Sequence, residues 1–445
     1  MLKRKIYQSL IEWKKQTEKM CLVVKGARQV GKTFIIDKFA RENYENYVYI
    51  NFDENPGYKV IFDGDLDVNN LIKQISLRVP NVSLVPHKTI IFLDEIQNCP
   101  NARTALKFLA LDKRFDVIAS GSLLGINYKE VESFPVGYTE QLEMYSLDFE
   151  EFLWANGIEE QSILDVKEFF DKKEVVPQAM HERMMELFKE YIVVGGMPRV
   201  VNDFVKNHNF ANVLKIQKAI ISDYEDDIAK YADGSEKAKA RACFLSIPKH
   251  LSKDYKKFRY SLVMPSGSSR KYAGSLMWLY DAGIINFCHN LEIPQLPLEG
   301  NSKSDTFKVY MRDTGLLVAM LDEGTQEDII DGNLGIYKGA IYENIIGDIL
   351  AKKGKKLYYF EYNSTLEVDF FIRYERVITA IEVKSSGNSK SKSLETLMEK
   401  YGVKKGIKLA PSNYGKKRWN WYFPNLYGNV FIKNENNYIN ELNCI

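Results

Sequence analysis

Short apolar runs alternate with amphipathic stretches in the first third of the chain. Apolar strands are expected at Cys21–Val24, Tyr47–Phe52, Thr89–Leu93 and Val117–Ala119. Amphipathic helices are expected at Leu2–Lys19, Thr33–Glu42, Leu71–Val79 and Ala102–Asp112. Short apolar strands that alternate with helices predict a parallel sheet buried on both faces, and therefore an α/β domain.

The pattern changes three times along the chain, so we expect four domains. Residues 1–145 form the α/β domain, and residues 146–235 show helices without a strong strand, which we interpret as a helical lid. Residues 236–328 follow the order helix, helix, helix, strand, loop, strand, which suggests a winged helix. Residues 329–445 begin with a helix and continue with strands, so a second α/β domain is expected there.

Composition supports a folded chain of several domains. A length of 445 residues with 45% hydrophobic residues is enough for roughly two to four packed cores. No run of about 18 apolar residues occurs, and the charged N-terminus lacks an apolar signal region, so we expect a cytoplasmic protein without a membrane span. The five cysteines lack CxxC spacing, which fits a reducing compartment and argues against a zinc cluster.

The charge is unevenly distributed along the chain. The formal net charge is only +2, yet the segment from Arg376 to Ile445 holds twelve Lys or Arg against five Asp or Glu, an excess of seven. A basic terminal domain is compatible with a polyanionic partner such as DNA or RNA. A solvated lysine-rich surface explains the same excess equally well.

A glycine-containing loop follows the first predicted strand. The stretch GARQVGKT fits the phosphate-binding pattern GxxxxGK[ST], and a helix is expected directly after it. Lys32 would reach the β- and γ-phosphates of a nucleotide, and the Thr33 hydroxyl would bind Mg²⁺. The predicted nucleotide-binding residues of the loop are Gly26, Ala27, Arg28, Gln29, Val30, Gly31, Lys32 and Thr33.

A second motif indicates hydrolysis rather than binding alone. The predicted strand IIFL ends in Asp94 and Glu95. Asp94 would hold Mg²⁺, and Glu95 would polarise the attacking water as the catalytic residue. The acid after Asp94 favours an ATPase over a P-loop kinase or transporter subunit, so ATP and Mg²⁺ are the expected cofactors.

Together with LVVKGARQVGKT and IIFLDEIQ, the stretches VIASGSLL, YSLDFEEFLW, YIVVGGMPRVV, VYMRDTGLLVAM and EVDFFI…AIEVK give the chain a family likeness. It resembles bacterial and archaeal AAA-type ATPases of the signal-transducing P-loop superclass, which carry an uncharacterised C-terminal domain. The resemblance covers nearly the whole chain. It implies a parallel-sheet ATPase domain followed by a lid, a winged helix and a terminal α/β domain.

The resemblance also implies two further contacts with nucleotide. Ser120 and Ser122 stand where such ATPases place a polar γ-phosphate sensor, although the family usually has Thr in place of Ser120. Arg199 in GGMPR would point at the nucleotide, in its own subunit or in a neighbour of a homo-oligomer. The alternatives are a simple turn at Ser120 and a structural loop arginine at Arg199.

A second group of charged residues lies in the terminal domain. In a strand, Glu382 and Lys384 of AIEVK point to one face and Val383 points to the other. Asp369 of EVDFFI is expected on the neighbouring strand, and Glu343 on the preceding helix. Without further context, this pattern is also expected of an exposed, salt-bridged hairpin.

The set of Glu343, Asp369, Glu382 and Lys384 resembles the PD-(D/E)xK core of restriction-endonuclease-like folds, although the proline of that motif is absent. The resemblance implies a divalent metal bound by Asp369 and Glu382, with Glu343 as a further ligand. Lys384 would be the catalytic lysine that orients the water or neutralises developing charge. Arg270 and Lys271 of the predicted winged helix would add nucleic-acid contacts, or that element would only regulate the ATPase.

The sequence therefore predicts an ATP-hydrolysing protein whose nucleotide state controls a metal-dependent, nuclease-like terminal domain. The alternative is a non-catalytic switch whose terminal domain only binds nucleic acid or a protein partner.

Overall fold

The computed structural model describes residues 2–122, 137–172, 174–231, 234–253, 256–333, 337–363, 366–385, 392–413, 415–417 and 420–424. The serine-rich stretch from Ser385 to Ser393, where the sequence predicts a loop, and the last part of the basic segment lie largely outside these residues. The described residues form two compact units. The N-terminal unit consists mainly of Arg4–Ser146, and the C-terminal unit mainly of the described residues from Leu147 onward.

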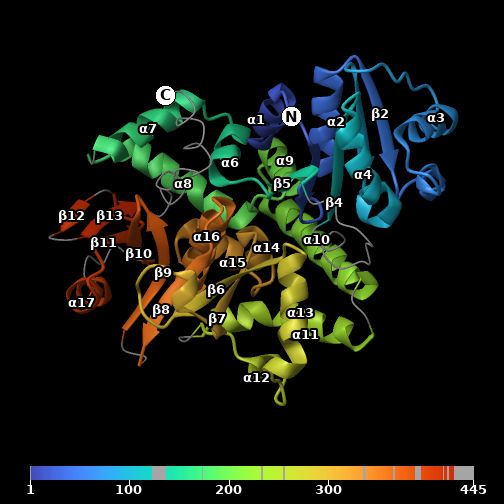
Figure 1. Ribbon diagram of the computed structural model, residues 1–445. Coiled ribbons are helices and arrows are strands. Elements are labelled where there is room, and N and C mark those ends of the chain that lie inside the picture. The colour runs from blue at the N-terminus through green and yellow to red at the C-terminus, as the bar shows by residue number, and fades with distance from the viewer. Residues whose placement is uncertain are drawn as a thin grey trace. The chain divides into compact units, whose positions relative to one another are not determined.

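The N-terminal unit is built on a five-stranded sheet in the order β2-β3-β4-β1-β5 (Figure 1). Every strand pair in this sheet is parallel, which confirms the predicted parallel α/β fold. The strands are β1 (Cys21–Gly26), β2 (Asn46–Asn51), β3 (Thr89–Asp94), β4 (Asp116–Ser122) and β5 (Thr139–Met144). The helices are α1 (Ile6–Lys15), α2 (Lys32–Asn43), α3 (Val68–Arg78) and α4 (Pro100–Asp112), with 3₁₀ turns η1 (Pro56–Phe62) and η2 (Ile96–Asn98).

Helices cover both faces of this sheet, which explains why its central strand β3 is buried along its whole length. Ile90 and Phe92 of β3 pack in one core with α1 and α2. Their neighbours Ile91 and Leu93 pack in the other core with α3 and α4. Alternate residues of a strand point to opposite faces, so one short strand supplies both cores.

The sequence did not predict β5. This strand reads TEQLEM, lies at the edge of the sheet and has mostly half-buried side chains, so it lacks the apolar run that identified the others. The strand expected at Val117–Ala119 is also longer than predicted, because β4 continues to Ser122. Ser120 and Ser122 therefore lie within the strand and not in a turn after it.

The C-terminal unit begins with helices, and its described residues contain no strand before β6, as predicted. The sequence missed α7 and α9. The helices are α6 (Phe149–Ala155), α7 (Glu160–Lys172), α8 (Gln178–Val194), α9 (Pro198–Asn207), α10 (Phe210–Tyr231), α11 (Gly234–Leu251), α12 (Tyr260–Val263), α13 (Ser269–Asp281), α14 (Thr314–Ala319), α15 (Thr325–Asp331), α16 (Lys338–Lys352) and α17 (Lys392–Tyr401), with a 3₁₀ turn η3 (Glu299–Asn301).

A mixed eight-stranded sheet follows, in the order β12-β13-β11-β10-β9-β8-β6-β7. Its strands are β6 (Ile285–Leu291), β7 (Ser302–Met311), β8 (Leu357–Tyr362), β9 (Leu366–Tyr374), β10 (Val377–Val383), β11 (Lys405–Ala410), β12 (Gly415–Lys417) and β13 (Asn420–Pro424). The predicted order of three helices and two strands is confirmed by α11, α12, α13, β6 and β7. However, β6 also pairs in parallel with β8, so one sheet continues across the expected boundary at residue 328. The name winged helix stays a prediction.

Helices cover both faces of the terminal part of this sheet. Leu394 and Leu397 of α17 pack in one core with Val368 and Ala380. On the other face α16 packs on β7 and β10. Gly347 allows this close approach, because a Cβ atom there would lie 3.3 Å from the Tyr310 ring.

Candidate functional site

The GARQVGKT loop joins β1 to α2 in the N-terminal unit. Gly26 ends β1 where a Cβ atom would lie 2.3 Å from the Met144 carbonyl oxygen, so no larger residue fits there. Gln29 and Gly31 have positive φ angles of 64° and 92°. Such turns, placed directly before a helix N-terminus, direct backbone N–H groups into a concave anion site.

Lys32 is the first residue of α2 and is buried against this loop. Its ammonium group donates to the carbonyl oxygens of Gly26 at 3.0 Å and Ala27 at 2.9 Å. Burial lowers the pKa of Lys32 to about 8, although the charges of Glu95 and Asp94 act in the opposite direction. The loop and the lysine that is predicted to bind phosphate are therefore in direct contact.

The Asp94 carboxylate is the centre of a hydrogen-bond network at the end of β3. Its Oδ2 atom accepts from the Thr33 hydroxyl at 2.8 Å, the Tyr49 hydroxyl at 3.0 Å and the Asn51 amide at 3.3 Å. Its Oδ1 atom accepts from the Ser120 hydroxyl. The carboxyl ends of β2, β3 and β4 thus meet the start of α2, as expected where ligands bind in open α/β sheets.

Magnesium fits the chemistry of this donor set. A threonine hydroxyl lies beside a buried carboxylate, and oxygen donors of this kind are the ligands that Mg²⁺ prefers, together with water and phosphate. Thr33 and Asp94 are the residues that would hold the ion. Tyr49 and Asn51, which the sequence did not indicate, orient the carboxylate.

Glu95 adopts a left-handed backbone conformation with φ of 53°, which is uncommon for a residue other than glycine. Its N–H donates to Asp94 Oδ1 at 3.1 Å, and its carboxylate accepts from the Gln97 amide. Both contacts fix the side chain relative to Asp94. Strained backbone of this type is concentrated at functional sites.

Arg4 is a further residue of this site that sequence patterns did not reveal. Its guanidinium donates to the carbonyl oxygen of Val30, in the phosphate loop, at 3.0 Å. It also donates to the carbonyl oxygen of Tyr145, just after β5, at 2.7 Å. Arg4 therefore joins the loop to the last residues of the N-terminal unit.

Arg199 lies exposed on α9 in the C-terminal unit. Its expected contact with nucleotide stays a prediction, as does the role of Ser120 as a γ-phosphate sensor. Ser122 is buried at the end of β4, opposite Gly26 in the parallel register.

The second predicted group of charged residues forms a buried cluster in the C-terminal unit. Glu343 on α16 accepts from Lys256 at Oε1, and from Lys308 at 3.4 Å and the Tyr310 hydroxyl at 3.2 Å at Oε2. Lys308 also donates to Glu367 at 2.6 Å. Burial favours the neutral acid, but the two lysines outweigh it and lower the pKa of Glu343.

Asp369 lies on β9 at an irregularity of the sheet. Tyr358 pairs with Phe371 and Phe360 with Val368, so Asp369 and Phe370 lie together opposite Tyr359. Such a bulge redirects a side chain, and the Asp369 carboxylate accepts from the Val383 N–H at 2.7 Å. Burial, and then the charge of Glu343, raise the pKa of Asp369.

Glu382 on β10 and Lys384, directly after the strand, point to the same side, as the alternation predicted. Their charged groups are 2.8 Å apart, Glu382 is buried, and the Lys384 side chain is 39% exposed. Glu382 also lies beside Lys408 in the parallel register of β10 and β11. This buried lysine was not expected, because β11 was not predicted.

The expected metal site is not formed in this arrangement. Among the described residues, no three His, Cys, Asp or Glu side chains are placed so that they could hold a metal ion. The physical reason is that Lys256 and Lys308 occupy the Glu343 carboxylate and Lys384 pairs with Glu382. The four predicted residues lie in one cluster, but the donor set does not fit a metal here, so the ligand roles of Glu343, Asp369 and Glu382 stay predictions.

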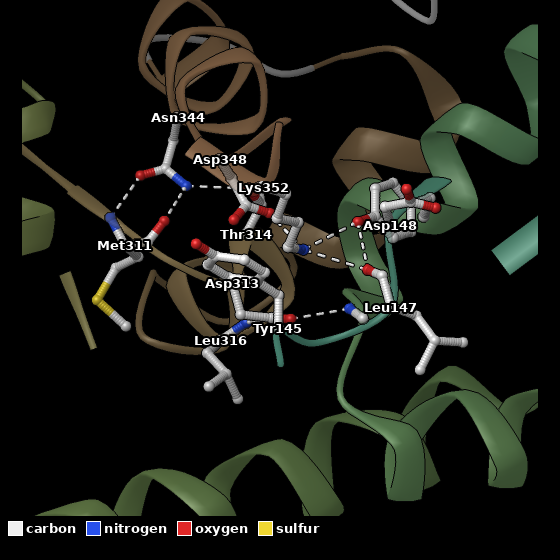
Figure 2. Close-up of polar contacts among 12 residues, drawn as sticks. Tyr145, Leu147, Asp148, Met311, Asp313, Thr314, Leu316, Asn344, Asp348 and Lys352 are labelled. Carbon is white, nitrogen blue, oxygen red and sulfur yellow. Dashed lines mark hydrogen bonds and ion pairs between the residues drawn. The ribbon is translucent and has the colours of Figure 1, made fainter. Parts of the chain in front are cut away.

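A third polar cluster fixes the start of the C-terminal unit (Figure 2). The Leu147 N–H donates to the Gly196 carbonyl oxygen at 2.7 Å, and the Leu147 carbonyl oxygen accepts from the Tyr191 hydroxyl at 2.7 Å and from Lys352 at 3.2 Å. Asp313 accepts from the Gly196 N–H at 2.8 Å and caps α14. We call these five residues the Leu147 clamp.

A titratable acid, Asp348, pairs with Lys352 of the clamp and gives a pH prediction. Burial raises the pKa of Asp348 to about 7, and Asp313 acts in the same direction, while Lys352 at 2.8 Å and Arg312 lower it. An acid whose pKa is raised on folding stabilises the protein at low pH, and this contribution is lost as pH rises towards 7.

Asp348→Asn is therefore expected to gain stability relative to the wild type as pH rises from about 4 to 7. The gain approaches about 1.4 kcal/mol for each pH unit. Urea unfolding of both proteins at several pH values measures it. A difference in unfolding free energy that does not change with pH contradicts the prediction.

Comparison with known protein families identifies the type of domain in the N-terminal unit. Residues 18–153 match the family described as AAA domain, so this part of the chain is a P-loop ATPase domain of the AAA type, as predicted. Residues 185–327 and 338–424 match two families that are each described as a domain of unknown function, DUF8612 and DUF4143. The nuclease-like type of the terminal domain therefore stays a prediction.

Individual relatives add little about function. An uncharacterized protein of Methanocaldococcus jannaschii is 25% identical over 207 residues, which cover 46% of this chain and 40% of that protein. An uncharacterized protein of Haemophilus influenzae is 27% identical over 208 residues, which cover 45% of this chain and 45% of that protein. The chain thus spans less than half the length of these curated relatives.

Among solved structures, the Walker-type ATPase of Pyrococcus abyssi is similar with a TM-score of 0.43 and 14% identity. The alignment covers 72% of this chain and 96% of that one. A likeness at this level supports no functional conclusion. Within the described ranges, every helix is too short or too polar to cross a lipid bilayer.

Proposed function

We propose that the chain binds ATP with Mg²⁺ and hydrolyses it at the site formed by the phosphate loop, Asp94 and Glu95. The observation that carries the proposal is the 2.8 Å contact between the Thr33 hydroxyl and Asp94, next to Lys32 at the start of α2. These residue types in this order are those that P-loop ATPases use for phosphate and magnesium.

Each residue has a separate role in this proposal. Backbone N–H groups of the loop and the Lys32 ammonium group bind the phosphates. Thr33 and Asp94 hold Mg²⁺, which supplies charge neutralisation during transfer. Glu95, fixed by Gln97 and the Asp94 carboxylate, orients the attacking water and accepts its proton.

Glu95→Gln is expected to retain ATP binding and to reduce turnover by about 100-fold or more, because general base catalysis contributes about 10²–10⁴. Phosphate release and binding of a fluorescent ATP analogue measure the two properties. Glu45→Gln, an exposed acid paired with Lys88, is the matched control. Turnover at the wild-type rate in Glu95→Gln rules out the assigned base.

We also propose that the nucleotide state controls the C-terminal unit through the chain segment from Tyr145 to Leu147. Val30 of the phosphate loop and Tyr145 are bound by the same Arg4 guanidinium. Two residues later, Leu147 is held by the Leu147 clamp, which includes Lys352 on α16. In this proposal, a movement of the phosphate loop pulls on Tyr145 through Arg4. The chain from Tyr145 to Leu147 then passes the movement to Lys352 of α16, the helix that carries Glu343.

Cleavage of DNA or RNA by the terminal domain is the second candidate function. The clustering of Glu343, Asp369, Glu382 and Lys384 favours it. We expect purified protein with Mg²⁺ or Mn²⁺ to nick plasmid DNA or degrade RNA.

Asp369→Ala and Lys384→Ala should each abolish this cleavage, while Lys405→Ala, which removes an exposed ion pair with Glu375, should not. Residual cleavage in both variants points to a contaminant. If the wild type cleaves neither DNA nor RNA, the non-catalytic switch is favoured, in which the terminal domain only binds nucleic acid or a protein. Exposed Arg270 and Lys271 at the start of α13 are the contacts that such binding would use.

A further inference from the structure

Residues 256 to 280, in the region that matches DUF8612, form a basic stretch of the chain. They include five Lys or Arg and neither Asp nor Glu, although the net charge of the whole chain is only +2. Three of the five, Arg259, Arg270 and Lys271, are exposed, and so is Lys249 near the end of α11. Four positive charges therefore face solvent in this region.

Contacts around the short helix α12 bring these four side chains to one place. Lys249 donates to the Leu262 carbonyl oxygen of α12 at 3.4 Å, and Arg259 directly precedes that helix. Lys271 donates to the Ser266 carbonyl oxygen, in the loop from α12 to α13, at 3.4 Å. In Figure 1, α12 lies at the lower edge of the drawing, below α11 and α13. We call the set of Lys249, Arg259, Arg270 and Lys271 the α12 basic surface.

Packing fixes the backbone of this surface. A Cβ atom on Gly267 would lie 2.1 Å from the Tyr260 carbonyl oxygen, so the loop after α12 is packed tightly against that helix. His250 Nε2 lies 2.9 Å from the Arg259 carbonyl oxygen. Burial lowers the pKa of His250, and the nearby charges of Lys249 and Arg259 act in the same direction. The backbone that carries the surface is thus in place before a partner binds.

The stability of the fold does not explain the charges at the start of α13. Arg270 and Lys271 lie in its first turn, which contains no acidic residue. A positive charge at a helix N-terminus opposes the helix dipole, at a cost of about 0.3–1 kcal/mol. Glu236 of the neighbouring helix α11 is already bound by Lys239 and by the Ser275 hydroxyl. A negatively charged partner would offset this cost.

The exposed face of α13 favours double-stranded DNA as that partner. The exposed residues at helical spacing on this face are Arg270, Ala273, Gly274 and Met277. No acid occurs on the helix before its last residue, Asp281. The major groove of B-form DNA is about 12 Å wide and admits a helix, whereas the major groove of A-form RNA is too narrow. Lysine and arginine side chains beside such a helix contact the phosphates.

We propose that the α12 basic surface binds the phosphate backbone of double-stranded DNA, with the exposed face of α13 turned towards the major groove. The inference rests on the proposed binding of nucleic acid and gives that binding a place in the fold. It requires neither cleavage nor ATP turnover, so it is tested without nucleotide and without metal.

The test measures binding of a fluorescent DNA duplex to the full-length protein by anisotropy, in EDTA and at several salt concentrations. Arg270→Ala combined with Lys271→Ala is expected to weaken binding by about tenfold or more, because two phosphate contacts are lost. The plot of log affinity against log salt should become shallower by about 2, since each phosphate contact contributes about 0.9 to its slope. Lys249→Ala and Arg259→Ala should each reduce the slope by about 1. The changes in α13 remove charges that oppose the helix dipole, so this double variant is expected to fold.

Lys73→Ala combined with Arg78→Ala is the matched control, because both residues are exposed on α3 and the same charge is removed. It should bind the duplex like the wild type. The inference is overturned if the wild type does not bind the duplex, or if the α13 double variant binds as tightly as the wild type. It is also overturned if polyglutamate or duplex RNA competes better than unlabelled duplex DNA.

Nicking assays with Mg²⁺ on the same proteins separate this outcome from failure of the nuclease proposal. Duplex binding without nicking supports the α12 basic surface and rejects the nuclease. Nicking with unchanged duplex binding by the α13 double variant does the reverse.

Discussion

Lys32→Ala is expected to weaken ATP binding by about 10- to 100-fold and to abolish measurable turnover. A hydrogen bond to a charged group contributes about 1.5–3 kcal/mol, and each 1.4 kcal/mol is tenfold in affinity. Lys32 is buried at the start of α2, against the phosphate loop. Calorimetry with ATP and Mg²⁺ and a phosphate-release assay measure the two effects.

The control for this variant is Lys25→Ala. Lys25 lies on β1 near the loop, and its ammonium group binds Gln141 at 3.0 Å and not the loop carbonyl oxygens. It should leave ATP binding and turnover unchanged. If Lys32→Ala binds and hydrolyses ATP like the wild type, the proposed site is wrong, and with it the ATPase function.

The phosphate loop and the end of β3 could be predicted because their functional residues are neighbours in the sequence and form known motifs. Lys32, Thr33, Asp94 and Glu95 stand in two short motifs, and the structure brings Thr33 and Asp94 together. Tyr49 and Asn51 could not be predicted in the same way. They reach Asp94 only because β2 lies next to β3, with Asn51 opposite Asp94, and a single sequence does not reveal that order.

The central strands were predicted for a related physical reason. β3 is buried on both faces and is apolar along its length, whereas the edge strand β5 reads TEQLEM and was missed. In the terminal domain, β10 was predicted from AIEVK, but α17 and β11 were not. The amphipathic pattern of α17 was not recognised after the serine-rich stretch, and β11 reads KGIKLA with two lysines.

The electrostatics of the acidic cluster were the least predictable part. Sequence reasoning selected four residues that do lie together, but it missed Lys256 and Lys308, which decide how the carboxylates are used. Both lysines come from a region expected to be a separate winged helix. The partners of a buried charge depend on the tertiary fold, and here β6 and β7 join the terminal sheet.

The stretches YIVVGGMPRVV and VYMRDTGLLVAM carry part of the family likeness, and the Leu147 clamp shows what their glycines contact. A Cβ atom on Gly195 would lie 2.2 Å from Asp313 Oδ1, and one on Gly315 would lie 2.5 Å from the Gly195 nitrogen. One on Gly196 would lie 2.0 Å from the Leu147 carbonyl oxygen. The two motifs thus pack backbone against backbone at the start of the C-terminal unit.

Gly196→Ala is therefore expected to destabilise the C-terminal unit by about 3 kcal/mol or more. The added methyl group would overlap backbone atoms of Leu147, and overpacking of this kind costs about 1–3 kcal/mol. The shift needed to relieve it also weakens two buried hydrogen bonds, from Leu147 to Gly196 and from Gly196 to Asp313. Each buried group left without its partner costs about 1–3 kcal/mol.

Urea unfolding followed by circular dichroism and by tryptophan fluorescence, to which Trp154 in α6 contributes, measures this loss. Gly274→Ala is the matched control, because the nearest atom to its Cβ position is 3.9 Å away and it lies inside α13. Alanine is the better helix former, so this control should be neutral or more stable by up to about 1 kcal/mol. If Gly196→Ala unfolds at the same urea concentration as the wild type, the Leu147 clamp does not stabilise the C-terminal unit. The result would also contradict the proposed route from Arg4 through Leu147 to α16, because that route requires Leu147 to be held firmly by the clamp.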